Sequence, residues 1–196
     1  MPRVTALRPG RPGRVLVELD GERWRTIPVD VAARSGLSVG LELDRKRLHT
    51  LRRELKRGAA LQAGVRALSR RDRSEQSLRD VLAQKGATEP EREEAIATLR
   101  RQGALDDDRF ARSRAAGLAD RGLGDAAIAF RLEQDGVAPE VTAEALAALE
   151  PEAVRAARLA ARRGRTEKTA RWLTARGFDP DSVEAALAFV AESDGP

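Results

Sequence analysis

Three segments of this sequence align on a glycine, and this repeat constrains the fold more than any other feature. They read SLRDVLAQKGATEPEREEAIATL, DAAIAFRLEQDGVAPEVTAEALAAL and KTARWLTARGFDPDSVEAALAFV, and their glycines are Gly86, Gly136 and Gly177. The glycines are 50 and then 41 residues apart, so the period is irregular. Self-similarity at such spacings is typical of tandem helical repeats, which present long surfaces to partners.

The matching positions predict a helix–turn–helix in each segment. A glycine ends a helix well because it adopts the left-handed conformation without a Cβ penalty. A proline follows each glycine, where the first turn of the next helix tolerates a missing N–H. Apolar residues recur at fixed offsets from each glycine: four residues before it (Leu82, Leu132, Leu173), nine and ten after it (Ala95-Ile96, Ala145-Leu146, Ala186-Leu187) and thirteen after it (Leu99, Leu149, Val190). The prolines are Pro90, Pro139 and Pro180. With a further helix before each pair, we expect a mainly α protein built as an elongated array of three three-helix modules.

The N-terminal segment predicts a small β-hairpin. RVLVEL and ERWRTI are alternating runs around Asp20-Gly21, a dipeptide favoured in tight type I′ turns. A two-residue loop predicts the pairs Val17–Trp24, Val15–Thr26 and Glu18–Arg23. The run at residues 4–7 is a candidate third strand. The expected domains are residues 1–44 (hairpin and basic extension), 45–103 (linker helix and first module), 104–150 (second module) and 151–196 (third module).

A helical period begins near Arg45. Its apolar stripe is regular at first and less regular later, and its members are Leu48, Leu51, Leu55, Ala59, Leu61, Val65 and Leu68. Gly58 and Gly64 fall inside this pattern and leave open whether one helix runs through it.

Composition argues against catalysis. There is no cysteine, and His49 is the only histidine, so thiolate nucleophiles, disulfides and cysteine-based zinc sites are excluded and general bases are scarce. We expect no catalytic residues, no metal and no cofactor. No apolar run approaches a membrane span, and the first residues lack the apolar core of a signal peptide, so we expect a cytoplasmic monomer.

Positive charge is concentrated at the N-terminal end. Residues 1–60 carry 14 basic and 7 acidic side chains, a net charge of +7, whereas residues 61–196 carry 22 and 24, a net charge of −2. This predicts a polyanion contact near the start of the chain. The candidate contacts form three clusters: Arg45, Lys46, Arg47, Arg52, Arg53, Lys56, Arg57; Arg70, Arg71, Arg73; and Arg162, Arg163, Arg165, Lys168. A solvated helix face is the alternative interpretation of each, and one helix does not point every member of a cluster the same way.

Asp106, Asp107 and Asp108 invite a metal-site interpretation, but a helix start fits them better. They stand between a helix ending near Gly103 and one that carries Phe110. An aspartate at that position accepts hydrogen bonds from free N–H groups. Adjacent side chains on a helix diverge by about 100°, so consecutive carboxylates do not share one ion. By the same reasoning we expect Ser74 to cap the helix that follows it.

Several of these segments resemble one family in the right order. SEQSLRDVLAQKG, GALDDDRFA, RGLGDAAIAFRLEQDGV and the closing RGFDPDSVEAAL look like the RecX family of modulators of the RecA recombinase. The residues that carry the resemblance are Ser74, Glu75, Leu78, Lys85 and Gly86, then Leu105, Asp106, Asp107, Arg109, Phe110 and Ala111. The match covers about residues 60–190.

The resemblance implies a non-enzymatic regulator. RecX proteins lie in the groove of RecA–DNA filaments, and most inhibit ATP hydrolysis, strand exchange and the co-protease function of the SOS response. We therefore expect the RecA filament as the partner, with single- or double-stranded DNA contacted through the basic N-terminal end. The alternative is a direct DNA-binding helix–turn–helix regulator. An acidic start of the second helix in EPEREEAIATLRRQG and PEVTAEALAALE opposes that alternative.

Overall fold

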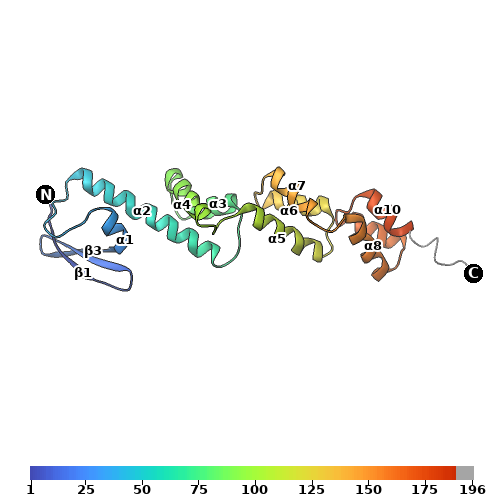
Figure 1. The fold of residues 1–196 in the computed structure, drawn as a ribbon, viewed down its shortest axis with the longest axis horizontal. Helices are drawn as coiled ribbons and strands as arrows, with labels where there is room; N and C mark the ends of the chain where they lie inside the picture. Colours follow the sequence, from blue (N-terminus) through green and yellow to red (C-terminus); the bar gives the residue numbers. More distant parts are fainter. Residues whose placement is uncertain (189–196) are drawn as a thin grey trace, which may run out of the picture. The chain divides into compact units, whose positions relative to one another are not determined.

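The computed structural model describes residues 1–188, in which a three-stranded sheet precedes a series of helices (Figure 1). The predicted apolar position at Val190 lies outside the described residues. The elements are β1 (Val4–Pro9), β2 (Arg14–Leu19), β3 (Glu22–Pro28), α1 (Val29–Arg34), α2 (Arg45–Leu68), α3 (Glu75–Gln84), α4 (Glu89–Arg101), α5 (Asp107–Asp120), α6 (Asp125–Gln134), α7 (Pro139–Ala147), α8 (Glu152–Arg163), α9 (Glu167–Thr174) and α10 (Pro180–Ala188). None of the helices described is long and apolar enough to cross a membrane.

The chain forms two compact units. Among the described residues, the first comprises residues 1–67 and 81–102, and the second comprises residues 68–80 and 103–188. The first unit holds the sheet with α1, most of α2 and α4, and the second holds α5 to α10. Helix α3 begins in the second unit and ends in the first. The finer division into four domains predicted from the sequence stays a prediction.

The N-terminal sheet is antiparallel, with the strand order β1-β2-β3, so the third strand expected at residues 4–7 is confirmed. Asp20 (φ 50°) and Gly21 (φ 87°) both have positive φ, as a type I′ turn requires. The pair Glu18–Arg23 is also confirmed.

Two further predicted pairs of the hairpin are wrong. Val17 lies opposite Arg25, and Val15 lies opposite Ile27, because the register shifts between Val17 and Glu18. A β-bulge adds one unpaired residue to a strand, so every pair beyond it moves by one position. The shift brings fully buried Ile27 beside Val15 and leaves the side chain of Trp24 exposed.

The core of the first unit lies between the sheet, α1 and α2. Its buried members are Val4, Val17, Ile27, Val31, Ala32, Leu43 and Leu51. Helix α1 was not predicted from the sequence, because six residues are too few to show a helical period. It buries Val31 and Ala32 against this core.

Helix α2 is continuous over 24 residues, and its two glycines allow neighbours to approach rather than breaking the helix. A Cβ on Gly58 would lie 3.3 Å from Cγ2 of Val31, and one on Gly64 would lie 2.8 Å from Cδ1 of Leu99 in α4. The buried stripe changes face along the helix. Its second half uses Ala60, Ala63, Gly64 and Ala67, so the predicted stripe through Ala59 and Val65, both exposed, is wrong there.

The glycine turns follow the predicted pattern. Gly86, Gly136 and Gly177 have φ of 79°, 77° and 82°, and the leucine four residues before each is fully buried. Pro90, Pro139 and Pro180 all fall at the start of the following helix. Thr88 and Glu91 add a capping box to α4.

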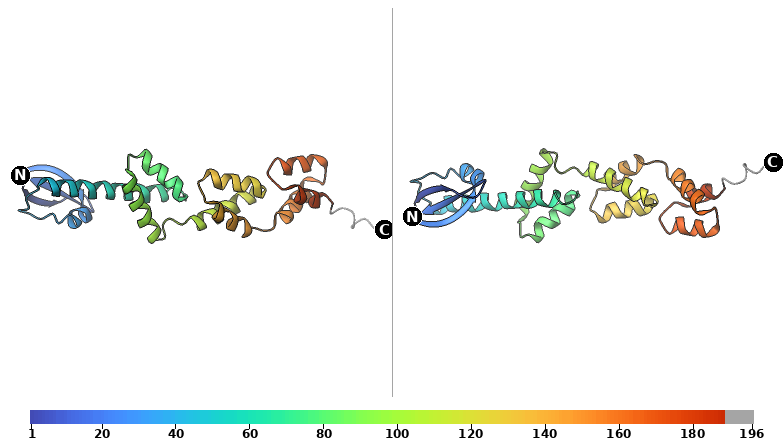
Figure 2. Two further views of the ribbon diagram at one scale, coloured as in Figure 1. Left: turned by 90° about the horizontal axis from the view of Figure 1, so that it is seen from above. Right: turned by 90° about the horizontal axis from the view of Figure 1, so that it is seen from below.

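Two helical triplets make up most of the second unit, and both can be followed in Figure 2. Helices α5, α6 and α7 enclose a core of Ala111, Ala115, Leu118, Ile128, Leu132, Val137 and Ala145. Helices α8, α9 and α10 enclose a core of Ala156, Ala160, Leu173, Phe178, Val183 and Ala186. The small alanines let the helices of each triplet approach closely, as the predicted Ala-Ile and Ala-Leu pairs require.

Candidate partner-binding surfaces

An exposed row of cations runs along the first half of α2. Its members, called the α2 stripe below, are Arg45, Lys46, Arg52, Arg53 and Lys56, and exposed His49 lies among them. At 3.6 residues per turn these five cations fall within a sector of about 120°. Leu51, with its neighbours Leu48 and Leu55, points to the sheet core on the other side of the helix. As expected, not every member of the predicted cluster shares one face: five of the seven do, and Arg47 and Arg57 do not.

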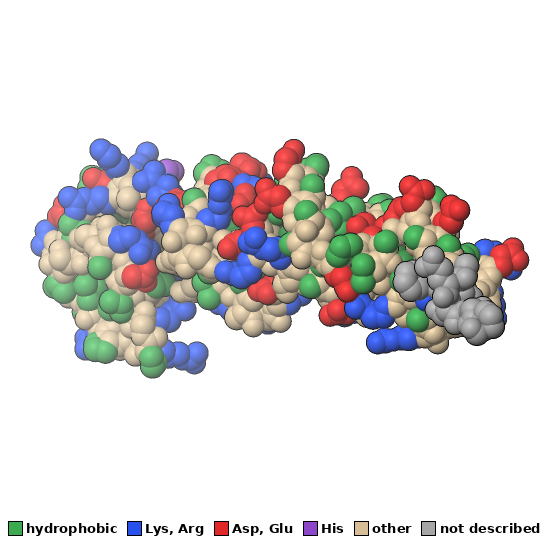
Figure 3. Space-filling model, turned by 45° about the vertical axis from the view of Figure 1, so that its right-hand side comes forward, with side chains coloured by type: hydrophobic (Ala, Val, Ile, Leu, Met, Phe, Trp, Pro, Cys, Tyr) green, Lys and Arg blue, Asp and Glu red, His purple; other side chains and the backbone are tan. Residues whose placement is uncertain are grey.

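The α2 stripe has no acidic counterpart. Over residues 1–188, none of its five cations forms an ion pair. Figure 3 shows many Lys and Arg side chains around the sheet and α2, and many Asp and Glu side chains over the helices that follow. The stripe is thus a surface of uncompensated positive charge, the kind that polyanions recognise.

The other two predicted members of this cluster have different surroundings. Arg57 forms ion pairs with Glu54 at 3.1 Å and with Glu94 at 2.7 Å. Exposed Arg47 lines a cavity of about 330 Å³ beside Asp44 and Leu41. Neither belongs to the α2 stripe.

Two members of the third predicted cluster make contacts within the third triplet. The guanidinium of Arg163 stacks over the ring of Trp172, 4.2 Å from its centroid. Arg165 donates from Nε to the backbone oxygen of Ala186 at 3.2 Å. Arg162, Arg163 and Lys168 are exposed and Arg165 is half-buried, so two of the four side chains, Arg163 and Arg165, also make contacts within the third triplet.

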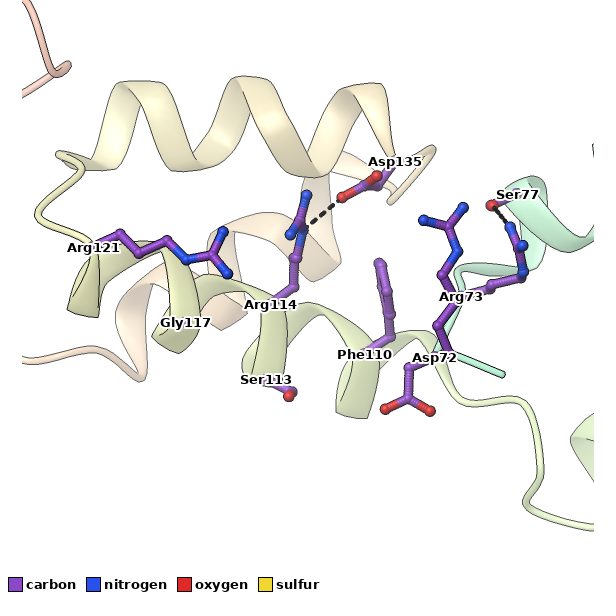
Figure 4. A pocket seen from close by; sticks show the side chains of 10 residues that line it. Asp72, Arg73, Ser77, Phe110, Ser113, Arg114, Gly117, Arg121 and Asp135 are labelled. Atoms are coloured by element: carbon purple, nitrogen blue, oxygen red, sulfur yellow. Dashed lines mark hydrogen bonds and ion pairs between the residues drawn. The ribbon is translucent and has the colours of Figure 1, made fainter. Parts of the chain in front are cut away.

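Two members of the second predicted cluster line a pocket in the second unit (Figure 4). The cavity measures about 340 Å³, and its lining is Arg71, Asp72, Arg73, Ser77, Phe110, Ser113, Arg114, Gly117, Arg121 and Asp135. We call it the arginine pocket. Arg70, the remaining member of the cluster, is exposed and does not line it.

The four arginines of this pocket differ in how well they are paired. Arg114 donates from Nε to Asp135 at 2.8 Å. Arg73 donates from one terminal nitrogen to Ser77 at 3.2 Å, but its buried Nε has no hydrogen-bond partner. Arg71 and Arg121 are exposed and form no ion pair within residues 1–188. Burial lowers the pKa of Arg73, and the positive charge of Arg71 lowers it further.

The three consecutive aspartates, Asp106 to Asp108, differ in the contacts that their side chains make. Asp106 caps α5 by accepting from the backbone N–H of Arg109 at 2.9 Å, as predicted. Asp107 instead accepts from the backbone N–H of Glu75 at 2.8 Å and so caps α3. Asp108 is exposed. The carboxylates of Asp106 and Asp107 therefore accept from separate amides, and within residues 1–188 no group of acidic and histidine side chains converges on a metal position.

Successive triplets are joined by one repeated contact. The first residue of α5, Asp107, caps the first residue of α3, and the first residue of α8, Glu152, accepts from the N–H of Asp125 at the start of α6 at 2.5 Å. The glycine turns contribute to the same contacts, and the contact region between two successive triplets is called a joint below. A Cβ on Gly136 would lie 2.6 Å from Cβ of Gln76, and one on Gly177 would lie 2.6 Å from Cβ of Ala127.

Additional hydrogen bonds strengthen both joints. Ser74 caps α3 by accepting from the N–H of Ser77 at 3.1 Å, which confirms the prediction, and its hydroxyl also donates to the backbone oxygen of Asp135. At the second joint, Arg176 donates to the backbone oxygen of Gly122 at 2.7 Å. Buried Arg155 donates to Leu123 at 2.9 Å and pairs with the carboxylate of Asp125.

Comparison with known proteins places these joined triplets in one family. The model of the first three-helix domain of RecX matches residues 60–99, and the model of the second matches residues 106–146. The curated regulatory protein RecX of Halorhodospira halophila is 34% identical over 146 residues, covering 69% of this chain and 91% of the relative. The chain belongs to the RecX family. The regulatory protein RecX of Vibrio parahaemolyticus is 32% identical, covering 67% of this chain and 91% of its own.

Solved RecX structures share the fold. A crystal structure of regulatory protein RecX superposes with a TM-score of 0.79 at 24% identity, covering 94% of this chain and 98% of that one. RecX from Lactobacillus salivarius gives a TM-score of 0.61 at 19% identity, covering 67% and 94%. The protein is therefore a RecX-family regulatory protein with the RecX fold, preceded by a small antiparallel sheet.

The arginine pocket of this RecX-family chain was only half visible in the sequence. Arg71 and Arg73 belong to a predicted cluster, but the side of the pocket formed by α5 was missed. Its members Phe110, Arg114, Gly117 and Arg121 are spaced four, three and four residues apart, which places them on one helix face. Because that face is neither uniformly apolar nor uniformly charged, a search for hydrophobic periodicity does not detect it.

Proposed function

We propose that this protein binds filaments of the RecA recombinase on DNA and inhibits the recombinase without catalysing a reaction itself. The inhibited activities would be ATP hydrolysis, strand exchange and the co-protease function of the SOS response. The observation that carries the proposal is the ordered pair of RecX three-helix domains, joined through Asp107 and followed by a third triplet. Such a series of modules offers several surfaces to a partner that is itself a repeating polymer.

The α2 stripe is the proposed contact with DNA in the filament. Its cations are exposed, share a face and lack acidic partners, so phosphates would meet no carboxylate on that face of α2. Each phosphate neutralised steepens the logarithmic salt dependence by about 0.7 for single strands and about 0.9 for duplexes. The stripe thus predicts binding that weakens strongly with salt.

A stand-alone helix–turn–helix regulator is less well supported. The second helix of the first turn, α4, begins with Glu89 and Glu91, and the second helix of the next, α7, begins with Pro139 and Glu140. The carboxylate of Glu91 accepts from the N–H of Thr88 at 2.9 Å, so it occupies the end that would meet a phosphate. These helices are poorly suited to enter a DNA groove.

The test is the DNA-dependent ATPase of RecA with substoichiometric amounts of this protein. We expect the rate to fall, and the double variant Arg52→Gln/Lys56→Gln to inhibit less, with a shallower salt dependence. The matched control is Arg112→Gln/Arg131→Gln, which removes the same charge from exposed positions in the second unit. An unchanged ATPase rate with the unmodified protein would refute the proposal. Tight binding to bare duplex DNA, with no effect on RecA, would favour the alternative.

A further inference from the structure

The arginine pocket keeps an opening that the helix beside it does not need. Gly117 lies in the interior of α5, has no positive φ, and a Cβ added to it would meet nothing within 4 Å. Glycine in a helix interior costs about 0.5–1 kcal/mol relative to alanine. Neither backbone conformation nor close packing within residues 1–188 requires a glycine here. Its effect is to leave the wall of the pocket open between Arg114 and Arg121.

The electrostatics of the pocket favour an incoming anion. Arg73 is half-buried beside Arg71, and burial together with that neighbouring charge lowers its pKa. Its Nε is buried without a hydrogen-bond partner, so the positive charge of Arg73 is incompletely compensated. An oxyanion placed against exposed Arg71 would offset the repulsion between this guanidinium and that of Arg73. Arginine forks bind carboxylates and phosphates in this way.

The remaining lining favours a peptide over a nucleic acid. Four arginines share the pocket with Asp72 and Asp135, which leaves a net charge of only +2. A nucleic-acid strand carries a phosphate at every nucleotide and would bring several of them near these aspartates. Phe110 and Gly117 provide an apolar wall beside the cations (Figure 4). The cavity, about 340 Å³, is at the small end of ligand sites and has room for a few side chains.

We propose that the arginine pocket binds an acidic peptide segment of a protein partner, with one carboxylate against Arg71, a second carboxylate against Arg121, and an apolar side chain between them against Phe110 and Gly117. This inference rests on the proposed function only in assigning the segment to the protein component of the filament. The two surfaces would then bind different components of the filament: the uncompensated cations of α2 suit the phosphates of DNA, and the pocket, which contains both cations and carboxylates, suits a peptide.

The binding test uses the full chain without any recombinase. A fluorescently labelled short peptide with a central phenylalanine flanked by glutamates is titrated with the protein, and a peptide with glutamines in place of the glutamates serves as the comparison. Binding should require the glutamates. Arg71→Gln/Arg121→Gln should weaken it roughly tenfold, the size of effect expected for lost charge-assisted hydrogen bonds. Both arginines are exposed, so the variant is expected to fold.

A second variant blocks the pocket without changing its charge. Gly117→Leu should also weaken peptide binding about tenfold, whereas Ala116→Leu, on the neighbouring exposed position, should leave it unchanged. Equal affinity of the two leucine variants would overturn the proposal. So would an oligonucleotide that displaces the peptide and binds Arg71→Gln/Arg121→Gln more weakly, because the pocket would then be a nucleic-acid site.

The filament assay separates this inference from the proposed function. If the pocket is used on the filament, Gly117→Leu should inhibit the RecA ATPase less than Ala116→Leu does. Full inhibition by Gly117→Leu would overturn the pocket proposal alone. Failure of the unmodified protein to inhibit would overturn the proposed function, while peptide binding would still report on the pocket.

Discussion

Replacing the three equivalent glycines by alanine separates backbone strain from the contact between triplets. All three have positive φ, so each substitution by alanine should lower the free energy of unfolding by about 1–2 kcal/mol through strain in the left-handed conformation. At Gly86 that is the whole effect, because a Cβ there would meet nothing within 4 Å. Gly86→Ala is therefore the internal reference for the other two.

Gly177→Ala should lower the free energy of unfolding considerably more than Gly86→Ala does. Its Cβ would lie 2.6 Å from both Cβ and the backbone nitrogen of Ala127, far inside van der Waals contact. The backbone of α6 cannot rotate away as a long side chain can, so the joint must open. Opening it weakens the hydrogen bonds from Gly124 to Arg176 (2.9 Å) and from Ala126 to Gly177 (3.2 Å). Overpacking of this kind adds about 1–3 kcal/mol, for a total of about 2–5 kcal/mol.

Gly136→Ala should fall between these two. Its Cβ would meet Cβ and Cγ of Gln76 at 2.6 and 2.9 Å; rotation of that side chain relieves only the contact with Cγ, but none of the nearest atoms belongs to the backbone. The assay is urea unfolding of the three variants and the unmodified protein, followed by circular dichroism. In a Trp24→Phe background, fluorescence reports on Trp172, which lies in the third triplet between Arg163 and Arg176. Equal losses for Gly86→Ala and Gly177→Ala would refute the reasoning, because strain alone would then explain both.

Four further predictions follow from individual contacts. Asp107→Ala should lower the free energy of unfolding by about 1–2 kcal/mol as a lost cap, whereas Asp108→Ala should change it little, and urea unfolding compares the two. Glu152→Ala should destabilise the protein, because Glu152 accepts from the N–H groups of Asp125 and Asp179, but Glu152→Gln should not. Burial raises the pKa of Glu152, so the folded protein should lose stability as pH rises past the ordinary pKa of a glutamate. The midpoint of thermal unfolding should then fall for the unmodified protein relative to Glu152→Gln. Arg155→Ala should lower the free energy of unfolding by about 1.5–3 kcal/mol in the same assay, because it removes the hydrogen bonds of a buried guanidinium to the backbone oxygens of Glu150 and Leu123. Gly117→Ala should raise the midpoint of thermal unfolding, with a gain of about 0.5–1 kcal/mol from helix propensity.

The sequence predicted the helical part well, because its signals are local. Gly86, Pro90 and Leu82 specify a turn, a helix start and a buried position within a few residues of one another, and the structure has all three. Capping by Ser74 and Asp106 is equally local, since each side chain bonds an amide three residues ahead. The α2 stripe was found as a charge cluster for the same reason.

Errors arose where a long-range partner decides the outcome. The hairpin register depended on a bulge that brings Ile27 into the core, which no pair rule anticipates. The second half of α2 buries Ala60 rather than Ala59, because α4 approaches Gly64 from that side. Charge density likewise did not separate Arg57, which is paired with Glu94, from the unpaired cations around it.

What the sequence by itself determined is the identity of the elements: helix ends at glycines, helix starts at prolines and capping side chains, and membership of a tandem helical array. These depend on backbone sterics and on hydrogen bonds within one turn of the chain, which any reader of the sequence can evaluate. Only the tertiary structure decided what each module does to its neighbour. Asp107 caps a helix 32 residues before it, and Gly177 is small because Ala127 lies against it. The arginine pocket exists because α5 meets the segment before α3, and surfaces of that kind form only when distant residues are brought together.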